Sequence, residues 1–265
     1  MRSRALLTGG LLACTLLVIG APVTHGQAPQ NRIVELLSQG KVVLGWFAPA
    51  RTPEAAKKAA GDPQMDFVFV NMEQVSSYNP AEVKTFLSTL REGGAQSTVP
   101  LMLRIPIFHD DPAAAQKRVA DVLSLGVQAV VFPDMESADE ARQALDAMNK
   151  KNVYPHNPKG ALASIFIVES EKGIANSREI TRERPTVAIP GPGTLSRVYN
   201  RDMAKVEQAI QTQLASCKEF NVPCGITAGP ADVAKRIKEG FRMIIIYDRD
   251  YPETIKAARE AAGRE

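Results

Sequence analysis

The chain has 265 residues, of which 45% are hydrophobic and 23% are charged, and its formal net charge at pH 7 is +3. These proportions are those of an ordinary soluble globular protein, and the length is sufficient for a large core. So small a positive charge does not indicate a nucleic-acid-binding surface, and we expect no nucleic-acid partner.

The first 26 residues have the layout of a secretory signal peptide. Two arginines precede an apolar run at residues 5–19, and residues 24–26 offer small side chains for cleavage. A retained membrane anchor is the alternative, although glycines and threonines make this run a poor spanning helix. Residues 11–14 also resemble a lipoprotein cleavage box. We expect cleavage near residue 26, export to the periplasm or the medium, and no membrane attachment afterwards.

After a helix expected at residues 31–39, eight short apolar runs alternate with eight helical segments. The runs lie at residues 42–47, 67–70, 100–104, 129–132, 165–169, 186–189, 222–227 and 243–248. Pro53 and Pro80 stand near helix starts, Gly93 and Gly126 stand at helix ends, and residues 137–140 form a capping box. This alternation, without a break in composition, predicts a single (β/α)8 TIM barrel domain over residues 27–265. A doubly wound open sheet is the alternative.

In such a barrel the active site lies at the C-terminal ends of the strands. The residues predicted there are Glu73, Arg104, Asp134, Glu136, Glu169, Thr194 and Asp248. Carboxylates around an arginine predict a site for a divalent cation and an anionic substrate. Oxygen ligands suit Mg²⁺ or Mn²⁺, and a guanidinium matches the geometry of a carboxylate. The alternative is that these side chains cap helices or pair with one another.

Histidine and cysteine are scarce in the chain. His156 precedes the fifth predicted strand, so we expect it at the surface of the opposite face. His109 follows the third strand and is either a general base or a solvated loop residue. Cys217 and Cys224 remain after signal cleavage, and they either form a disulfide in an oxidising compartment or stay as two buried thiols.

Several stretches of the chain resemble the HpcH/HpaI aldolase and citrate lyase family. The resemblance is best at residues 66–73, 104–106, 126–133, 137–141, 168–169 and 191–196. It implies a barrel of the phosphoenolpyruvate/pyruvate-binding type and a lyase that forms the enolate of a 2-oxo acid with a divalent metal. It also implies that Arg104 and Glu73 act in catalysis and that Glu169 binds the metal. Because related proteins form oligomers, a homo-oligomer is a further expectation.

The sequence departs from the family pattern at three positions. The family's second metal-binding aspartate falls on Thr194, its histidine falls on Gln74, and the aspartate before that histidine falls on Asn71. Threonine is a poorer ligand than a carboxylate for a hard cation, and glutamine cannot transfer a proton near neutral pH. Glu136, Asp134 and Glu73 are therefore candidates to replace the missing ligand.

These observations define a candidate site and two functions. We predict catalytic roles for Arg104, Glu73 and Gln74, substrate binding by Arg104, Gly191, Pro192, Gly193 and Thr194, and metal binding by Glu169, Glu136 and Asp134. The preferred function is an exported carbon–carbon lyase that acts on a small 2-oxo or hydroxy acid. The alternative is a catalytically impaired barrel that binds a small carboxylate or a partner protein.

Overall fold

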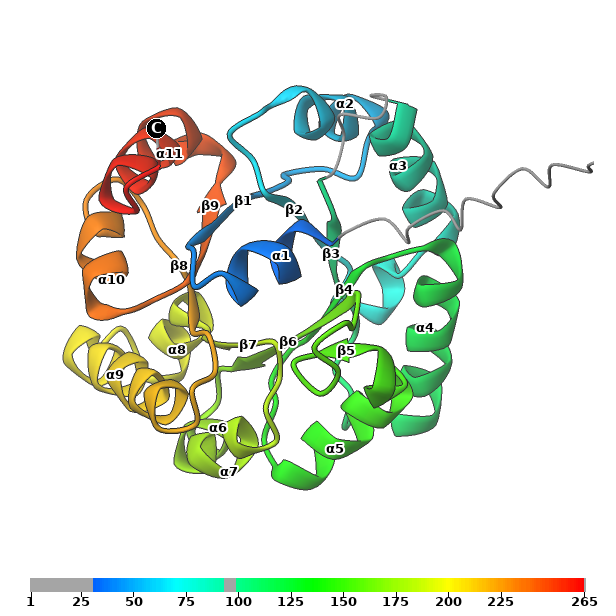
Figure 1. Ribbon diagram of the computed structural model, residues 1–265. Helices are drawn as coiled ribbons and strands as arrows, with labels where there is room; N and C mark the ends of the chain where they lie inside the picture. Colours follow the sequence, from blue (N-terminus) through cyan, green and yellow to red (C-terminus); the bar gives the residue numbers. More distant parts are fainter. Residues whose placement is uncertain (1–30, 93–98, 265) are drawn as a thin grey trace, which may run out of the picture.

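The computed structural model describes residues 31–92 and 99–264. Its strands curl around a common centre, and helices cover the outside of the sheet (Figure 1). The predicted signal peptide, at residues 1–26, and the predicted helix end at Gly93 lie outside the described residues. In the two described ranges, no helix is both long enough and apolar enough to cross a membrane.

All strand pairings of the sheet are parallel. The strands are β1 (Val43–Phe47), β2 (Phe67–Asn71), β3 (Leu101–Arg104), β4 (Ala129–Phe132), β5 (Val153–Tyr154), β6 (Leu162–Val168), β7 (Val187–Pro190), β8 (Gly225–Thr227) and β9 (Met243–Tyr247). Their order is β5-β6-β4-β3-β2-β1-β9-β8, with β7 paired to β6. In the described chain, β7 approaches the start of β8 through a single bridge between Ala188 and Cys224. The predicted parallel α/β fold is thus confirmed as a curled sheet ringed by helices.

The helices begin and end largely where the sequence places their caps. They are α1 (Arg32–Ser38), α2 (Pro53–Gly61), α3 (Pro80–Glu92), α4 (Pro112–Leu125), α5 (Ala138–Ala147), α6 (Glu171–Ala175), α7 (Ser177–Arg182), α8 (Pro192–Val198), α9 (Met203–Glu219), α10 (Val233–Glu239) and α11 (Tyr251–Ala261). Ser137 caps α5 by accepting a 3.2 Å hydrogen bond from the backbone N–H of Glu140. Gly126 ends α4 with φ of 92°, a conformation that suits glycine.

Two apolar layers result from the alternation of side chains along the strands. One layer fills the centre of the curled sheet with residues such as Phe67, Met102 and Ile165. The other packs residues such as Phe132 and Phe166 between the sheet and the surrounding helices. Helix α1 contributes Ile33, Leu36 and Leu37 to the central layer, so it covers the N-terminal ends of the strands (Figure 1).

The structure contains elements that the sequence pattern did not predict. The two-residue strand β5 and the short helix α8 both lie in stretches that the pattern left as loops. Strand β8 is shorter than its predicted run because Pro223 has no N–H with which to continue a ladder. Cys217 and Cys224 are both buried and unpaired, so of the two alternatives for these residues the structure has the free thiols.

Candidate active site

A cavity of about 250 Å³ opens at the C-terminal ends of the strands. Its walls include the apolar side chains of Phe69, Ile167 and Ile189, which belong to the central layer. The ends of β2, β3 and β6 contribute Asn71, Glu73, Arg104 and Glu169 to its lining. The turn after β7 and the start of α8 contribute Gly191, Pro192, Gly193, Thr194 and Arg197. The cavity therefore brings together most of the residues that the sequence predicted to act as a site.

Arg104, the last residue of β3, joins two carboxylates in this cavity. Its Nη2 atom donates a 2.8 Å hydrogen bond to Oε1 of Glu169 and a second hydrogen bond to Oε1 of Glu73. The side chain of Glu169 is 4% exposed and that of Glu73 is 30% exposed, so the pair with Glu169 is the buried one. Asn71 supports this arrangement, because its Oδ1 accepts the backbone N–H of Glu73 at 3.1 Å.

Burial controls the electrostatics of Glu169. The pKa of its carboxyl is raised, chiefly because burial disfavours the charged form. The positive charge of Arg104 and a hydrogen bond with Thr194 oppose this rise, whereas the charges of Glu73 and Asp134 add to it. Glu169 therefore binds a proton more readily than a solvent-exposed carboxylate does.

Gly191 permits the close approach of the backbone to Glu169. A Cβ atom at this position would lie 2.8 Å from the Cβ of Glu169 and would overlap its Oε2. Any larger residue would therefore displace the carboxylate. The close approach to Glu169 is sufficient to explain the glycine that follows β7, so no role in phosphate binding is needed to account for it.

Arg197 is a lining residue that the sequence reasoning missed. Its Nη2 donates a 3.1 Å hydrogen bond to Oγ1 of Thr194, three residues earlier on α8. Within the described ranges Arg197 forms no ion pair, so its positive charge is available to an anion at the mouth of the cavity. Helical spacing from Thr194 was the signal that could have identified it.

This cavity is not lined by four of the predicted site residues: Gln74, Asp134, Glu136 and Asp248. Asp248 instead accepts hydrogen bonds from Trp46 at 3.0 Å and from Lys58 at 2.6 Å. Gln74 is exposed and precedes the short 3₁₀ turn Val75–Ser77, where its carbonyl accepts the hydroxyl of Ser77 at 3.0 Å. Glu136 accepts hydrogen bonds from Ser170 at 2.9 Å and from Lys172 at 2.8 Å. The hydrogen bond from Lys172 is the main reason that the pKa of Glu136 is lowered.

Glu136 instead lines a neighbouring cavity of about 240 Å³, together with His109 and Glu140. The Nδ1 atom of His109 lies 3.0 Å from Oε1 of Glu140, whose other oxygen accepts the backbone N–H of Glu136. Burial raises the pKa of Glu140. His109 is therefore oriented by a buried carboxyl group, but it is not among the residues that line the Arg104 cavity.

The carboxylates near the cavity determine whether a divalent cation could bind there. Among the described residues, no three His, Cys, Asp or Glu side chains surround a common point. Mg²⁺, however, is usually held by one or two carboxylates, and water and substrate complete its shell. Asp134 has a φ of 48°, and its buried Oδ1 accepts no hydrogen bond. The charge of Asp134 adds to the rise in the pKa of Glu169, although Asp134 is not among the residues that line the Arg104 cavity. These two carboxylates are the donors that a divalent cation could use.

Comparisons with known proteins agree on one family. The family model described as HpcH/HpaI aldolase/citrate lyase matches residues 43–228. A hydroxypyruvate/pyruvate aldolase from Delftia acidovorans is 24% identical, over 83% of this chain and 87% of the relative.

Solved structures of family members share the fold. A family protein from Burkholderia cenocepacia superposes with a TM-score of 0.64 and 20% identity, over 88% of this chain and 98% of the other. The citrate lyase beta subunit from M. tuberculosis, solved with oxaloacetate and magnesium, gives a TM-score of 0.58 and 20% identity, over 83% and 97% of the two chains.

Proposed function

The chain belongs to the HpcH/HpaI aldolase/citrate lyase family, and from this premise we propose that it is a carbon–carbon lyase acting on a small 2-oxo or hydroxy acid. The observation that carries the proposal is the Arg104 cavity, where a guanidinium held by two carboxylates lies at the C-terminal ends of parallel strands. The name of the relative from Delftia acidovorans supports a pyruvate-type product. We also propose a complete (β/α)8 barrel over residues 27–265, which the Ala188–Cys224 bridge supports, in an exported protein.

The residues of the cavity suit a retro-aldol reaction on a 4-hydroxy-2-oxo acid. Glu73, the more exposed of the two carboxylates, takes the proton of the C4 hydroxyl group. The C3–C4 bond then breaks, an aldehyde leaves, and the electron pair moves towards the C2 oxygen. Arg104 stabilises the enolate oxygen with hydrogen bonds that are already oriented. Glu73 then returns this proton to C3, which gives the 2-oxo acid product and restores the carboxylate.

Glu169 and Asp134 are the residues that would hold a divalent cation such as Mg²⁺ or Mn²⁺. When bound, the cation would supply a Lewis acid for the negative charge that develops on the enolate. The buried and unpaired oxygen of Asp134 supports this assignment, because a buried carboxylate oxygen without a donor is satisfied by a cation. The proposal leaves out Glu136, which is already engaged by Ser170 and Lys172.

Removing Asp134 as a ligand is expected to weaken metal binding. Asp134→Asn should raise the Kd for Mn²⁺ at least about tenfold, because an amide is a poorer ligand for a hard cation. Calorimetric titration of chelator-treated protein measures this. The matched control is Glu136→Gln, which removes a nearby carboxylate and should leave the Kd within about twofold. Equal Kd values for the Asp134→Asn variant and the parent protein would contradict the assignment.

Removing the guanidinium at the mouth of the cavity is expected to weaken substrate binding without slowing the chemical step. Arg197→Ala should raise KM roughly fivefold to tenfold and leave kcat within about twofold, because Arg197 contacts the bound acid equally in the ground and transition states. Steady-state kinetics separate the two constants. Lys205→Ala removes an exposed cation from α9 and should change neither. A fall in kcat with constant KM would contradict this role.

The function itself is tested by incubating the purified protein with Mg²⁺ and a panel of 4-hydroxy-2-oxo acids while pyruvate release is followed. We expect release with at least one member of the panel and its loss in Arg104→Ala. A specific observation favours the alternative of a binding protein: no histidine is among the lining residues of the Arg104 cavity. Oxalate, which resembles the pyruvate enolate, separates the two. Tight binding of oxalate with no turnover of any acid would support the binding protein and contradict the lyase.

A further inference from the structure

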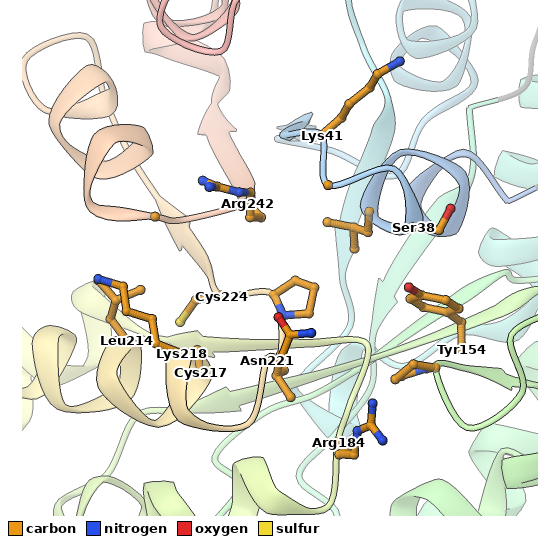
Figure 2. Close-up of a pocket in the computed structure, with 16 residues that line it drawn as sticks. Ser38, Lys41, Tyr154, Arg184, Leu214, Cys217, Lys218, Asn221, Cys224 and Arg242 are labelled. Carbon is orange, nitrogen blue, oxygen red and sulfur yellow. The ribbon is translucent and has the colours of Figure 1, made fainter.

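A cavity of about 430 Å³ lies at the N-terminal ends of the strands, on the face opposite to the Arg104 cavity (Figure 2). Its walls are the end of α1, the residues after β5, and the loops that lead into β7, β8 and β9. The Arg104 cavity, in contrast, is lined by the last residues of β1 and β9. The two cavities are therefore separate, and the proposed lyase reaction uses only one of them.

The charged side chains that line this N-terminal cavity are all positive. Four cationic side chains line it, Lys41, Arg184, Lys218 and Arg242, and none of its lining residues is an aspartate or a glutamate. In the part of the chain that the structure describes, none of the four forms an ion pair. Arg242 donates only to the neighbouring carbonyl of Phe241, at 3.2 Å. A concave surface with unneutralised charge of one sign attracts ions of the other sign.

The stem of Lys218, one of these cations, lies against the backbone at the end of α10. Gly240, with φ of 116°, ends α10, and a Cβ atom there would lie 3.3 Å from Cε of Lys218. The stem of Lys218 thus packs close to Gly240, a position whose positive φ favours glycine. Figure 2 shows the side chains of Lys218, Arg242, Asn221, Tyr154 and Arg184 around the same opening. Asn221 and Tyr154 add neutral groups that can hydrogen-bond to an anion.

A simpler explanation of the four cations is that they offset the ends of nearby helices. Helices α1, α7, α9 and α10 all end around this cavity, and cationic side chains are favourable near the carbonyl groups of a helix C-terminus. This explanation accounts for the charges, but it requires no open space between them. A volume of about 430 Å³ is within the usual range for small-molecule sites.

We propose that the N-terminal cavity binds a compact polyanion that carries at least two phosphate or carboxylate groups. The guanidinium groups of Arg184 and Arg242 match the planar oxygen pairs of either group, and Lys218 adds a compact positive charge. The four cations are far apart in sequence: Lys218 lies in the last turn of α9, and the other three lie in the loops before β1, β7 and β9. A ligand that bridges them would therefore join these segments. This site is independent of the lyase reaction proposed above.

Calorimetry with two probes tests the proposal and distinguishes the two kinds of oxyanion. Inorganic pyrophosphate represents phosphate ligands, and propane-1,2,3-tricarboxylate represents carboxylate ligands that lack a 2-oxo group. At low ionic strength we expect one probe to bind with a stoichiometry of one. The variant Lys218→Gln/Arg242→Gln should bind it at least about tenfold more weakly. Added salt should weaken binding to the parent protein, because the contacts are ionic.

Two further variants make the test specific. The control Lys84→Gln/Lys256→Gln removes the same charge from exposed helix positions away from both cavities, and it should bind the probe like the parent. Arg184 lines the cavity on the side opposite Lys218 and Arg242 (Figure 2). The single variant Arg184→Gln should weaken binding about fivefold. It provides a second test if the double variant does not fold. The proposal is overturned if neither probe binds, or if the double variant and the control lose affinity equally. A lower Tm of the double variant, without anion binding by the parent protein, would also overturn the proposal. That result would show that the cations only stabilise the helix C-termini.

Discussion

Replacing Glu169 with glutamine is expected to remove lyase activity while leaving the fold as stable as before, or more stable, at pH 7.5. We expect kcat/KM to fall at least about 100-fold, because glutamine neither binds a divalent cation well nor keeps the charge that orients Arg104. Stability should not fall with it, because glutamine resembles the protonated form that burial favours. The matched variant Glu136→Gln removes a carboxylate from the neighbouring cavity and should keep most of the activity.

The pH dependence of this effect has a definite sign. The pKa of Glu169 in the folded chain is raised, so the folded state binds its proton more tightly than the unfolded state does. Its contribution to stability is complete below the carboxyl pKa of the unfolded chain and is lost as the pH rises through the raised pKa. The parent protein should therefore lose stability relative to Glu169→Gln between pH 4.5 and pH 8. Urea unfolding at both ends of this range measures the difference. A less stable Glu169→Gln variant at pH 7.5 would show that the ion pair with Arg104 outweighs the cost of burial.

Replacing Arg104 with alanine is expected to damage both activity and stability. The free energy of unfolding should fall by about 3 kcal/mol, because the buried Glu169 loses its partner. The value of kcat/KM should fall by about 1000-fold or more, because the guanidinium is the main donor to the enolate. Arg104→Lys keeps the charge but not the planar geometry, so it should recover most of the stability and little of the activity. Activity within about tenfold of the parent in Arg104→Ala would contradict the proposed role of this residue.

The positions of the three central residues could be predicted because each follows a recognisable apolar run. Arg104 ends β3, Glu73 follows β2 closely and Glu169 directly follows β6, and parallel strands place such residues at one edge of the sheet. The apolar runs do not reveal which of these side chains contact one another. Strand β4 lies between β3 and β6, yet Arg104 contacts Glu169 directly. Such a contact depends on the curl of the sheet and on side-chain direction, which no local pattern encodes.

The positions of Gln74 and Glu136 depended on loop conformation, which the sequence pattern left open. A 3₁₀ turn begins directly after Gln74 and leaves it exposed. After β4 the backbone passes through the left-handed conformation of Asp134, and Glu136 then pairs with Ser170 and Lys172 from the following strand-to-helix turn. Thr194, which the sequence predicted as a substrate-binding residue and a poor metal ligand, accepts a hydrogen bond from Arg197 and is hydrogen-bonded to Glu169.

The basic N-terminal cavity could not be predicted for a different reason. Its cations, at positions 41, 184, 218 and 242, are dispersed over most of the chain and form no motif. The net charge of +3 does not reveal this cluster, because acidic residues elsewhere in the chain offset most of the basic ones. Only the meeting of four connections at one end of the sheet brings these charges together.

The central claim is that the Arg104 cavity stabilises the enolate of a 2-oxo acid. Exchange of the methyl protons of pyruvate for deuterium, followed by proton NMR in D₂O with Mg²⁺ present, tests this without knowledge of the aldehyde partner. We predict that the parent protein accelerates the loss of the methyl signal, and that Arg104→Ala lowers this rate at least about 100-fold. Exchange by the parent protein at the rate of buffer with Mg²⁺ alone, at saturating pyruvate, would contradict the claim.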